Sequence, residues 1–160
     1  MHVDFDSLSD TSRVWIYQSN RPFFPEEVNE MGILLESFTS QWQSHGAAVS
    51  ASFKVLLNQF IILGGDDKGP SVGGCSIDSS VHFIQELEKK FNLSLLNKSD
   101  MAFFANQEIV ILPFNKVKEA IANNILSKDD YYFNNSVTEL DQYKKDWKQK
   151  LENSWVAKYF

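Results

Sequence analysis

A thiol, a carboxylate and an imidazole recur at helical spacing in the middle of the chain, at Cys75, Asp78 and His82. Steps of three and four residues put side chains on one face of an α-helix, so these groups would share a face. A thiol beside an imidazole base is the equipment of a cysteine nucleophile, and the start of a helix favours the thiolate. The structural alternative stays open, because Asp78 opposes ionisation of Cys75 and also suits the first turn of a helix.

The start of the same helix has the features of an anion site. Gly74 precedes Cys75, and hydroxyl groups follow at Ser76 and Ser79. Backbone amides that lead from a glycine loop into a helix bind phosphate or carboxylate groups. The phosphate loop of ATPases is absent, because Lys68 is not followed by Ser or Thr. We therefore expect a small anionic ligand at Gly74, Ser76 and Ser79, with no cofactor and no ATPase activity.

A second polar group follows the apolar run at residues 14–17. Gln18, Asn20 and Arg21 leave this run together, and a guanidinium clamps a carboxylate or phosphate through two parallel donors. The alternative is a turn in which Arg21 pairs with a nearby acid. Sequence spacing leaves open whether this group and Cys75 line one site.

Composition excludes several classes of protein. The chain has 160 residues and a formal charge of −6, which argues against bulk binding of nucleic acid. No apolar run approaches the ~20 residues of a membrane helix, and the single cysteine fits a reducing compartment. The histidines and the cysteine lack the spacing of metal ligands. We expect a cytoplasmic protein without a metal site, away from the membrane, whose oligomeric state the sequence does not indicate.

The hydrophobic pattern predicts the elements that position these residues. Residues 14–17 are apolar on both faces and predict a central strand, and residues 25–45 carry an apolar stripe at helical spacing. Residues 49–57 and 60–63 predict a hairpin around Asn58-Gln59. A second helix from near Ser76 to residue 91 and a short strand at 93–95 complete a βαββαβ order. This order predicts an α+β fold, the ferredoxin-like two-layer sandwich.

The last third of the chain predicts an extension of that sandwich. A hairpin is expected over residues 101–112 around Asn106-Gln107, followed by a helix from residue 117, a strand at 131–133 and a helix over 140–151. The loop expected over residues 64–74 holds most of the glycines, and no linker divides the chain. We therefore expect one domain, residues 1–160, with residues 101–160 packed on a core of residues 1–100.

Several stretches of the chain resemble a family of short, uncharacterised bacterial proteins. They include residues 12–21 (SRVWIYQSNR), residues 74–84 (GCSIDSSVHFI) and Phe133-Asn134-Asn135, and the resemblance covers essentially the full length. Members of this family commonly carry the automatic label "ABC transporter ATPase", and no established activity accompanies the resemblance. This chain has Val156 and Lys158 where a histidine and an arginine are usual in the family.

Two functions are compatible with these patterns. The first is a module that binds a small anionic ligand or a protein partner through Asn20, Arg21 and the helix start at residues 74–79. The alternative is an enzyme in which Cys75 is a nucleophile or a redox thiol and His82 is its base.

Overall fold

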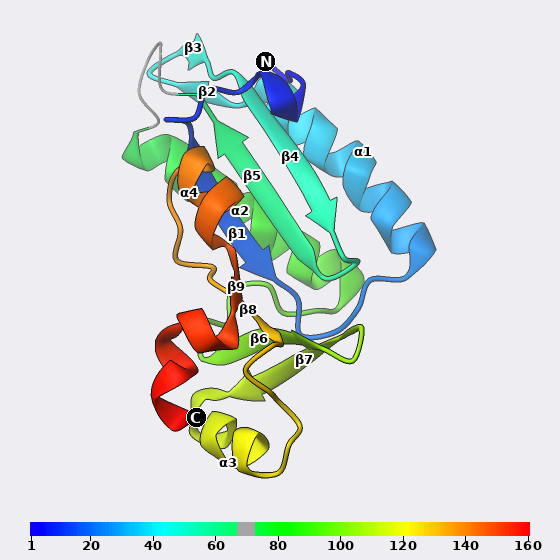
Figure 1. Cartoon of the computed structure of the whole chain (residues 1–160). Helices are drawn as coiled ribbons and strands as arrows, with labels where there is room; N and C mark the ends of the chain where they lie inside the picture. Colours follow the sequence, from blue (N-terminus) through cyan, green and yellow to red (C-terminus); the bar gives the residue numbers. More distant parts are fainter. Residues whose placement is uncertain (67–72) are drawn as a thin grey trace.

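The computed structural model describes residues 1–66 and 73–160, in which helices combine with three antiparallel sheets in an α+β architecture (Figure 1). The first sheet has the spatial order β1-β5-β4. Its strands are β1 (Arg13–Gln18), β4 (Ala51–Leu56) and β5 (Phe60–Gly65). The helix α1 (Pro25–Gln41) follows β1, and the helix α2 (Gly74–Phe91) follows β5. A small ladder of β2 (Gln43–Ser44) and β3 (Ala47–Ala48) joins α1 to β4.

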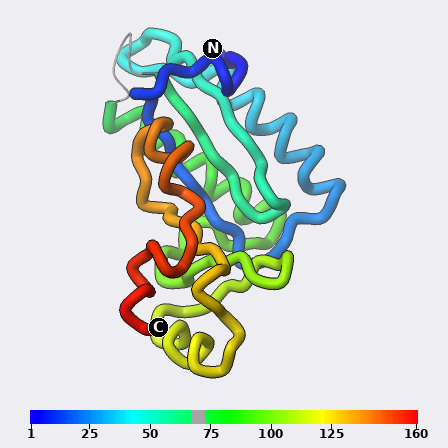
Figure 2. The backbone as a smooth tube through the Cα atoms, in the orientation of Figure 1, coloured from blue at the N-terminus to red at the C-terminus, as the bar shows by residue number. Residues whose placement is uncertain are grey.

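The second large sheet belongs to the C-terminal part and has the order β7-β6-β8-β9. Its strands are β6 (Asp100–Ala105), β7 (Glu108–Pro113), β8 (Tyr131–Phe133) and β9 (Lys148–Lys150). The remaining helices are α3 (Val117–Ala122), α4 (Leu140–Asp146) and the 3-10 turns η1 (Phe5–Ser7), η2 (Phe114–Lys116), η3 (Leu151–Asn153) and η4 (Trp155–Tyr159). The two termini lie at opposite ends of the molecule, as the backbone trace shows (Figure 2).

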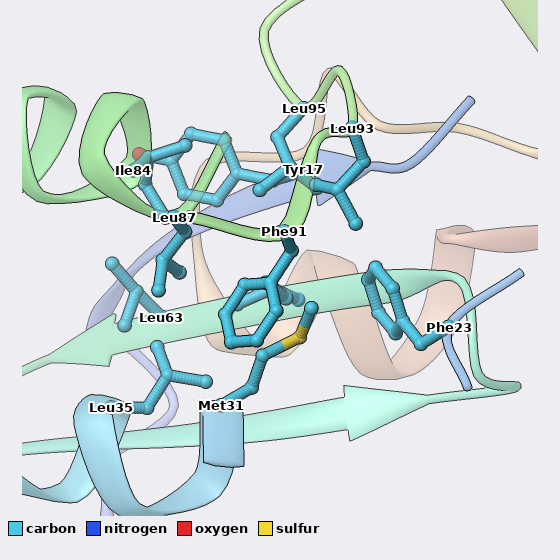
Figure 3. Packing of buried hydrophobic residues seen from close by; sticks show 11 residues of the cluster. Tyr17, Phe23, Met31, Leu35, Leu63, Ile84, Leu87, Phe91, Leu93 and Leu95 are labelled. Carbon is cyan, nitrogen blue, oxygen red and sulfur yellow. The ribbon is translucent and has the colours of Figure 1, made fainter. Parts of the chain in front are cut away.

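The middle strand of the first sheet is buried on both faces. Ile61 and Leu63 of β5 point toward α1 and α2, where Figure 3 shows Leu63 among the side chains of both helices. Phe60 and Ile62 point to the opposite face and pack with residues of α4 and of the second sheet. All four side chains have 0% exposure. The first sheet is therefore the middle layer between two helices on one side and the C-terminal part on the other.

The α+β class is confirmed, whereas the ferredoxin-like topology is not. The strands expected at residues 14–17, 49–57 and 60–63 correspond to β1, β4 and β5, and β5 lies between the other two, as in a split βαβ unit. The strand expected at residues 93–95 is wrong, because Leu93 and Leu95 instead bury their side chains at the end of α2. The first sheet thus has three strands, and β1 is an outer strand instead of the expected central one.

β1 has an apolar pattern because both faces of its sheet are covered. Trp15 and Tyr17 pack toward the helices, while Val14 and Ile16 pack toward the C-terminal part. An outer strand of a sheet that lies between two layers has the same pattern as a central strand. Along the outer edge of β1 the described residues form one short contact, in which the amide of Val14 donates a hydrogen bond of 3.0 Å to the carbonyl of Thr138.

Both predicted hairpins are confirmed, and both turns contain left-handed backbone. The second has the expected two-residue turn, whereas the first pairs Leu56 with Phe60 and connects its strands through residues 57–59, with its left-handed residues one position earlier than the predicted turn. Leu57 and Asn58 both have φ of 53°, and Asn106 and Gln107 have φ of 53° and 62°. The second hairpin joins its own sheet and does not extend the first one. Of the loop expected over residues 64–74, residues 64 and 65 end β5, and residues 67–72 lie outside the described residues.

The helix expected over residues 140–151 is shorter than predicted. α4 ends at Asp146, and the chain continues as β9, which pairs with β8. Trp147 stands at this change and packs on the rings of Phe60 and Phe133, with centroids 5.2 and 4.7 Å away. These aromatic contacts connect the first sheet to the C-terminal part.

Substituting Phe60→Ala tests this connection. Removing a fully buried ring that contacts Phe133 and Trp147 should lower the free energy of unfolding by about 3–5 kcal/mol, measured by urea denaturation. The control is Leu57 in the adjacent turn, whose side chain is exposed. Leu57→Ala should change the free energy of unfolding by less than about 0.5 kcal/mol. Equal effects of the two substitutions would contradict the packing described here.

Candidate functional site

The first turn of α2 has backbone amides directed out of the helix. The amides of Ser76 and Ile77 both donate to the carbonyl of Gly73, at 3.1 and 3.0 Å. Gly74 and Cys75 are the first two residues of the helix, so the helix contains no carbonyl one turn earlier that could accept from their amides. The 18-residue helix also concentrates a partial positive charge at this end, and its first turn contains no acid.

A histidine that sequence reasoning missed lies beside this helix end. His45 and Gly46 form the turn between β2 and β3, and both have left-handed backbone, with φ of 52° and 79°. The ring of His45 lies over Gly73, where an added Cβ would be 3.1 Å from Nε2. The hydroxyl of Ser76 donates to the carbonyl of Gln43, which holds this turn against α2.

An open pocket of about 430 Å³ occupies the space between the end of α1, the β2–β3 turn and the start of α2. The indole of Trp42 forms part of its wall and is held by a hydrogen bond of 2.9 Å from Nε1 to the carbonyl of Ser76. Its walls combine aromatic, amide, imidazole, thiol and hydroxyl groups. The lining residues are Phe38, Gln41, Trp42, Gln43, His45, Cys75, Ser76 and Ser79.

The structure brings together only some of the residues predicted for this region. Cys75 is exposed and lines the pocket with Ser76 and Ser79, while the added groups are His45 and Trp42. The hydroxyl of Ser76 is buried and already donates within the fold, and that of Ser79 donates to the carbonyl of Ser76 at 3.0 Å. Neither hydroxyl proton is therefore directed at a ligand.

His82 and Asp78 do not line the pocket. His82 lies two turns along α2 from Cys75, about 10 Å at 1.5 Å per residue, which exceeds hydrogen-bond reach. Its side chain is 75% exposed, and Nε2 lies 3.4 Å from the carboxylate of Glu86. The distance along the helix therefore separates His82 from the thiol.

Arg21 has its partners within the fold. Its two terminal nitrogens donate to the two carboxylate oxygens of Glu27, at 2.8 and 3.0 Å. They also donate to the carbonyls of Pro22 and Phe91, and the guanidinium lies 4.9 Å from the centre of the Phe24 ring. The arginine thereby joins the exit of β1 to the start of α1 and the end of α2.

Gln18 and Asn20 are also used internally. The side chain of Gln18 is buried, donates to the carbonyl of Asp100 at 3.3 Å and accepts from Asn135 at 2.9 Å. The amide of Asn20 donates to the carbonyl of Ser94, and its Oδ1 accepts from the amide of Ser94. These bonds tie the end of β1 to the segment that follows α2. A role of these residues in ligand binding stays a prediction.

Arg21 and Cys75 therefore do not share one site. Arg21 binds the last residue of α2, Phe91, whereas Cys75 is the second residue of that helix. Sixteen steps of about 1.5 Å separate the two positions by roughly 24 Å along the axis. A second open depression, of about 510 Å³, lies toward the end of α2 and is lined by Gln85, Glu88, Lys89 and Leu93, none of them a predicted site residue.

Comparisons of the chain with models of known protein families, with curated proteins and with solved structures give no match. Across residues 1–66 and 73–160, no three His, Cys, Asp or Glu side chains are grouped to hold a metal ion. A helix that crosses a bilayer must be both long and apolar, and no helix in the described residues is both.

The Arg21–Glu27 pair predicts a dependence of stability on pH. Hydrogen bonding to Arg21 holds the pKa of Glu27 below its usual value. The carboxylate therefore stabilises the fold above its unfolded pKa of about 4.3, and this contribution is lost as the pH falls through the lowered folded value. The difference in Tm between the wild type and Glu27→Gln, followed by circular dichroism, should be largest near pH 7 and should narrow below about pH 4.

The control is Glu36→Gln on the same helix, since Glu36 is exposed and forms no ion pair with any described residue. Its difference in Tm from the wild type should stay constant over this range. A constant difference for Glu27→Gln as well would show that the pair contributes nothing to stability.

Proposed function

We propose that the chain is a binding module for a small anionic ligand and that the pocket at the start of α2 is its site. The observation that carries the proposal is the position of His45, whose ring lies over Gly73, the residue before α2, and which lines the pocket together with Cys75. A helix N-terminus and an imidazole both donate hydrogen bonds to phosphate or carboxylate oxygens. The pocket volume of about 430 Å³ is in the range of small-molecule sites.

The walls of the pocket support a ligand with an apolar part as well as the anionic group. Phe38 stacks on Phe83 with ring centres 4.6 Å apart, and Trp42 packs against Phe38 and Trp15. Trp42 is buried and supports Phe38, so the half-buried ring of Phe38 is available for contact with little further loss of side-chain freedom. A phosphorylated or carboxylated metabolite with a flat or aliphatic portion matches this combination.

Thermal melts with inorganic phosphate, adenosine monophosphate and acetyl phosphate test the proposal. A ligand at about 100 times its Kd should raise Tm by roughly 5 °C. His45→Ala should abolish most of this shift, because it removes the imidazole donor. The matched control is His82→Ala, which removes an exposed histidine outside the pocket and should leave the shift unchanged.

Ionic strength is held constant with sodium chloride in every melt, since phosphate also stabilises proteins without a specific site. The proposal fails when none of the three anions raises Tm above the chloride control. It also fails when His45→Ala and the wild type show the same shift.

A second candidate function, thiol chemistry at Cys75, is favoured by one observation. Cys75 and His45 line the same pocket, so His45, and not His82, is the imidazole available to accept the thiol proton. In that case Cys75 acts as a nucleophile or redox thiol toward a ligand bound at the helix end.

The rate of alkylation by iodoacetamide tests this candidate. If His45 assists the thiol, His45→Ala should slow modification of Cys75 at pH 7 by on the order of tenfold, with His82→Ala equal to the wild type. Modification is followed by intact mass. Equal rates in all three proteins would exclude the imidazole from the chemistry of this cysteine.

The absence of ATP hydrolysis and the cytoplasmic compartment are also part of this proposal. The family resemblance of residues 12–21 and 74–84 provides no activity of its own, and the missing phosphate loop supports binding without ATP hydrolysis. The single exposed cysteine supports the cytoplasm as the compartment, because reducing conditions keep such a thiol free.

A further inference from the structure

β7 is an outer strand with an unusual composition for its position. It lies at the edge of the β7-β6-β8-β9 sheet, and its central residues, Ile109 to Leu112, are half-buried and carry no charge. Natural proteins protect outer strands with charges, bulges or covering segments, because an open edge pairs readily with another strand. β7 begins at Glu108 and ends at Pro113, and the residues between them include the strong strand formers Ile109, Val110 and Ile111.

The backbone of β7 has unused hydrogen-bonding groups. The two-residue turn at Asn106-Gln107 makes Ala105 and Glu108 a pair that exchanges both hydrogen bonds, and the pattern then alternates along the strand. The N–H and C=O groups of Ile109 and Ile111 therefore point away from β6. In the part of the chain that the structure describes, these groups have no hydrogen-bond partner.

The other outer strands of the two large sheets are β4, β1 and β9, and each is paired in part with another segment or carries charges. The outer edge of β4 starts with hydrogen bonds between Ala51 and the N-terminal segment, through Met1 and Val3. The outer edge of β1 is bridged to the segment before α4 at Arg13. β9 is short and carries lysines at both ends. β7 carries a charge only at its first residue, Glu108, and among the described residues no other segment is hydrogen-bonded to the outward groups of Ile109 and Ile111.

We propose that β7 pairs with β7 of a second copy of this chain, in antiparallel orientation around a two-fold axis. The axis passes Val110, which faces Val110 of the second copy. Ile109 then lies opposite Ile111 of that copy, and these pairs exchange the outward hydrogen bonds that are unused in the single chain. The sheets of the two copies become one continuous sheet. This proposal is independent of the pocket at the start of α2.

The composition of β7 favours a second copy as the occupant over a foreign strand. In this register the central pairs, Val110 with Val110 and Ile109 with Ile111, are between β-branched side chains, which are favourable cross-strand pairs. Glu108 faces Leu112 of the other copy, so the two glutamates never oppose each other. The side chain of Phe114, the residue that follows β7, is 58% exposed and adds to the apolar surface that association would cover. Two-fold symmetric pairing is also the commonest way in which identical chains associate.

Charges placed on the axis test the register. Sedimentation equilibrium of the wild type should show a dimer, while Val110→Lys and Val110→Glu, which each oppose like charges across the axis, should raise the dimer Kd by about tenfold or more. An equimolar mixture of the two variants should dimerise again, because lysine then faces glutamate. The control is Ile33→Lys on α1, where a 71% exposed side chain lies away from β7, and it should remain dimeric.

Amide hydrogen exchange of the wild type provides a second measurement that needs no substitution. The amides of Ile109 and Ile111 should exchange more slowly as the protein concentration rises through the dimer Kd. A chain that is monomeric at all concentrations overturns the proposal. A dimer in which exchange at Ile109 and Ile111 is independent of concentration also overturns it, because another surface then forms the contact.

Discussion

The burial of β5 on both faces is the constraint on which the rest of the structure depends. Phe60 and Ile62 require an apolar layer on one side, and Ile61 and Leu63 require another on the opposite side. The helices α1 and α2 provide one layer, and the C-terminal part provides the other. Because β5 leads toward α2 and pairs with β4, its position also brings the start of α2 and the β2–β3 turn to the same end of the sheet (Figure 1).

The two ends of α2 have different roles. At its C-terminal end, Arg21 binds both carboxylate oxygens of Glu27 and the carbonyl of Phe91. The guanidinium therefore connects the end of β1 with α1 and α2. At its N-terminal end, Cys75 and His45 line an open pocket, and the ring of His45 lies over Gly73. In the function proposed above, ligand binding and structural support are separated along one helix, so that a ligand at the start of α2 leaves the arginine contacts undisturbed.

Much of the fold was predictable because hydrophobic periodicity and turn residues are local signals. They identified α1, α2 and both hairpins, including the turn at Asn106-Gln107. The strand at residues 93–95 failed because a short apolar run is compatible with any buried segment, and packing against α2 decided its conformation. The candidate site was predicted in part. Spacing along a helix found Cys75 and selected His82. His45 reaches the pocket through the β2–β3 hairpin, whereas the pair His45-Gly46 in the sequence indicates only the end of the first helix.

The central claim is that the chemistry of this chain resides at the start of α2 and not at Arg21. Nuclear magnetic resonance of the ¹⁵N-labelled protein during titration with inorganic phosphate tests it most directly, since every amide reports separately. The account predicts shift changes that saturate together at His45, Gly74 and Cys75, with the amides of Asn20 and Arg21 unmoved. Changes that concentrate at Asn20 and Arg21, or no saturable change at the start of α2, would contradict it.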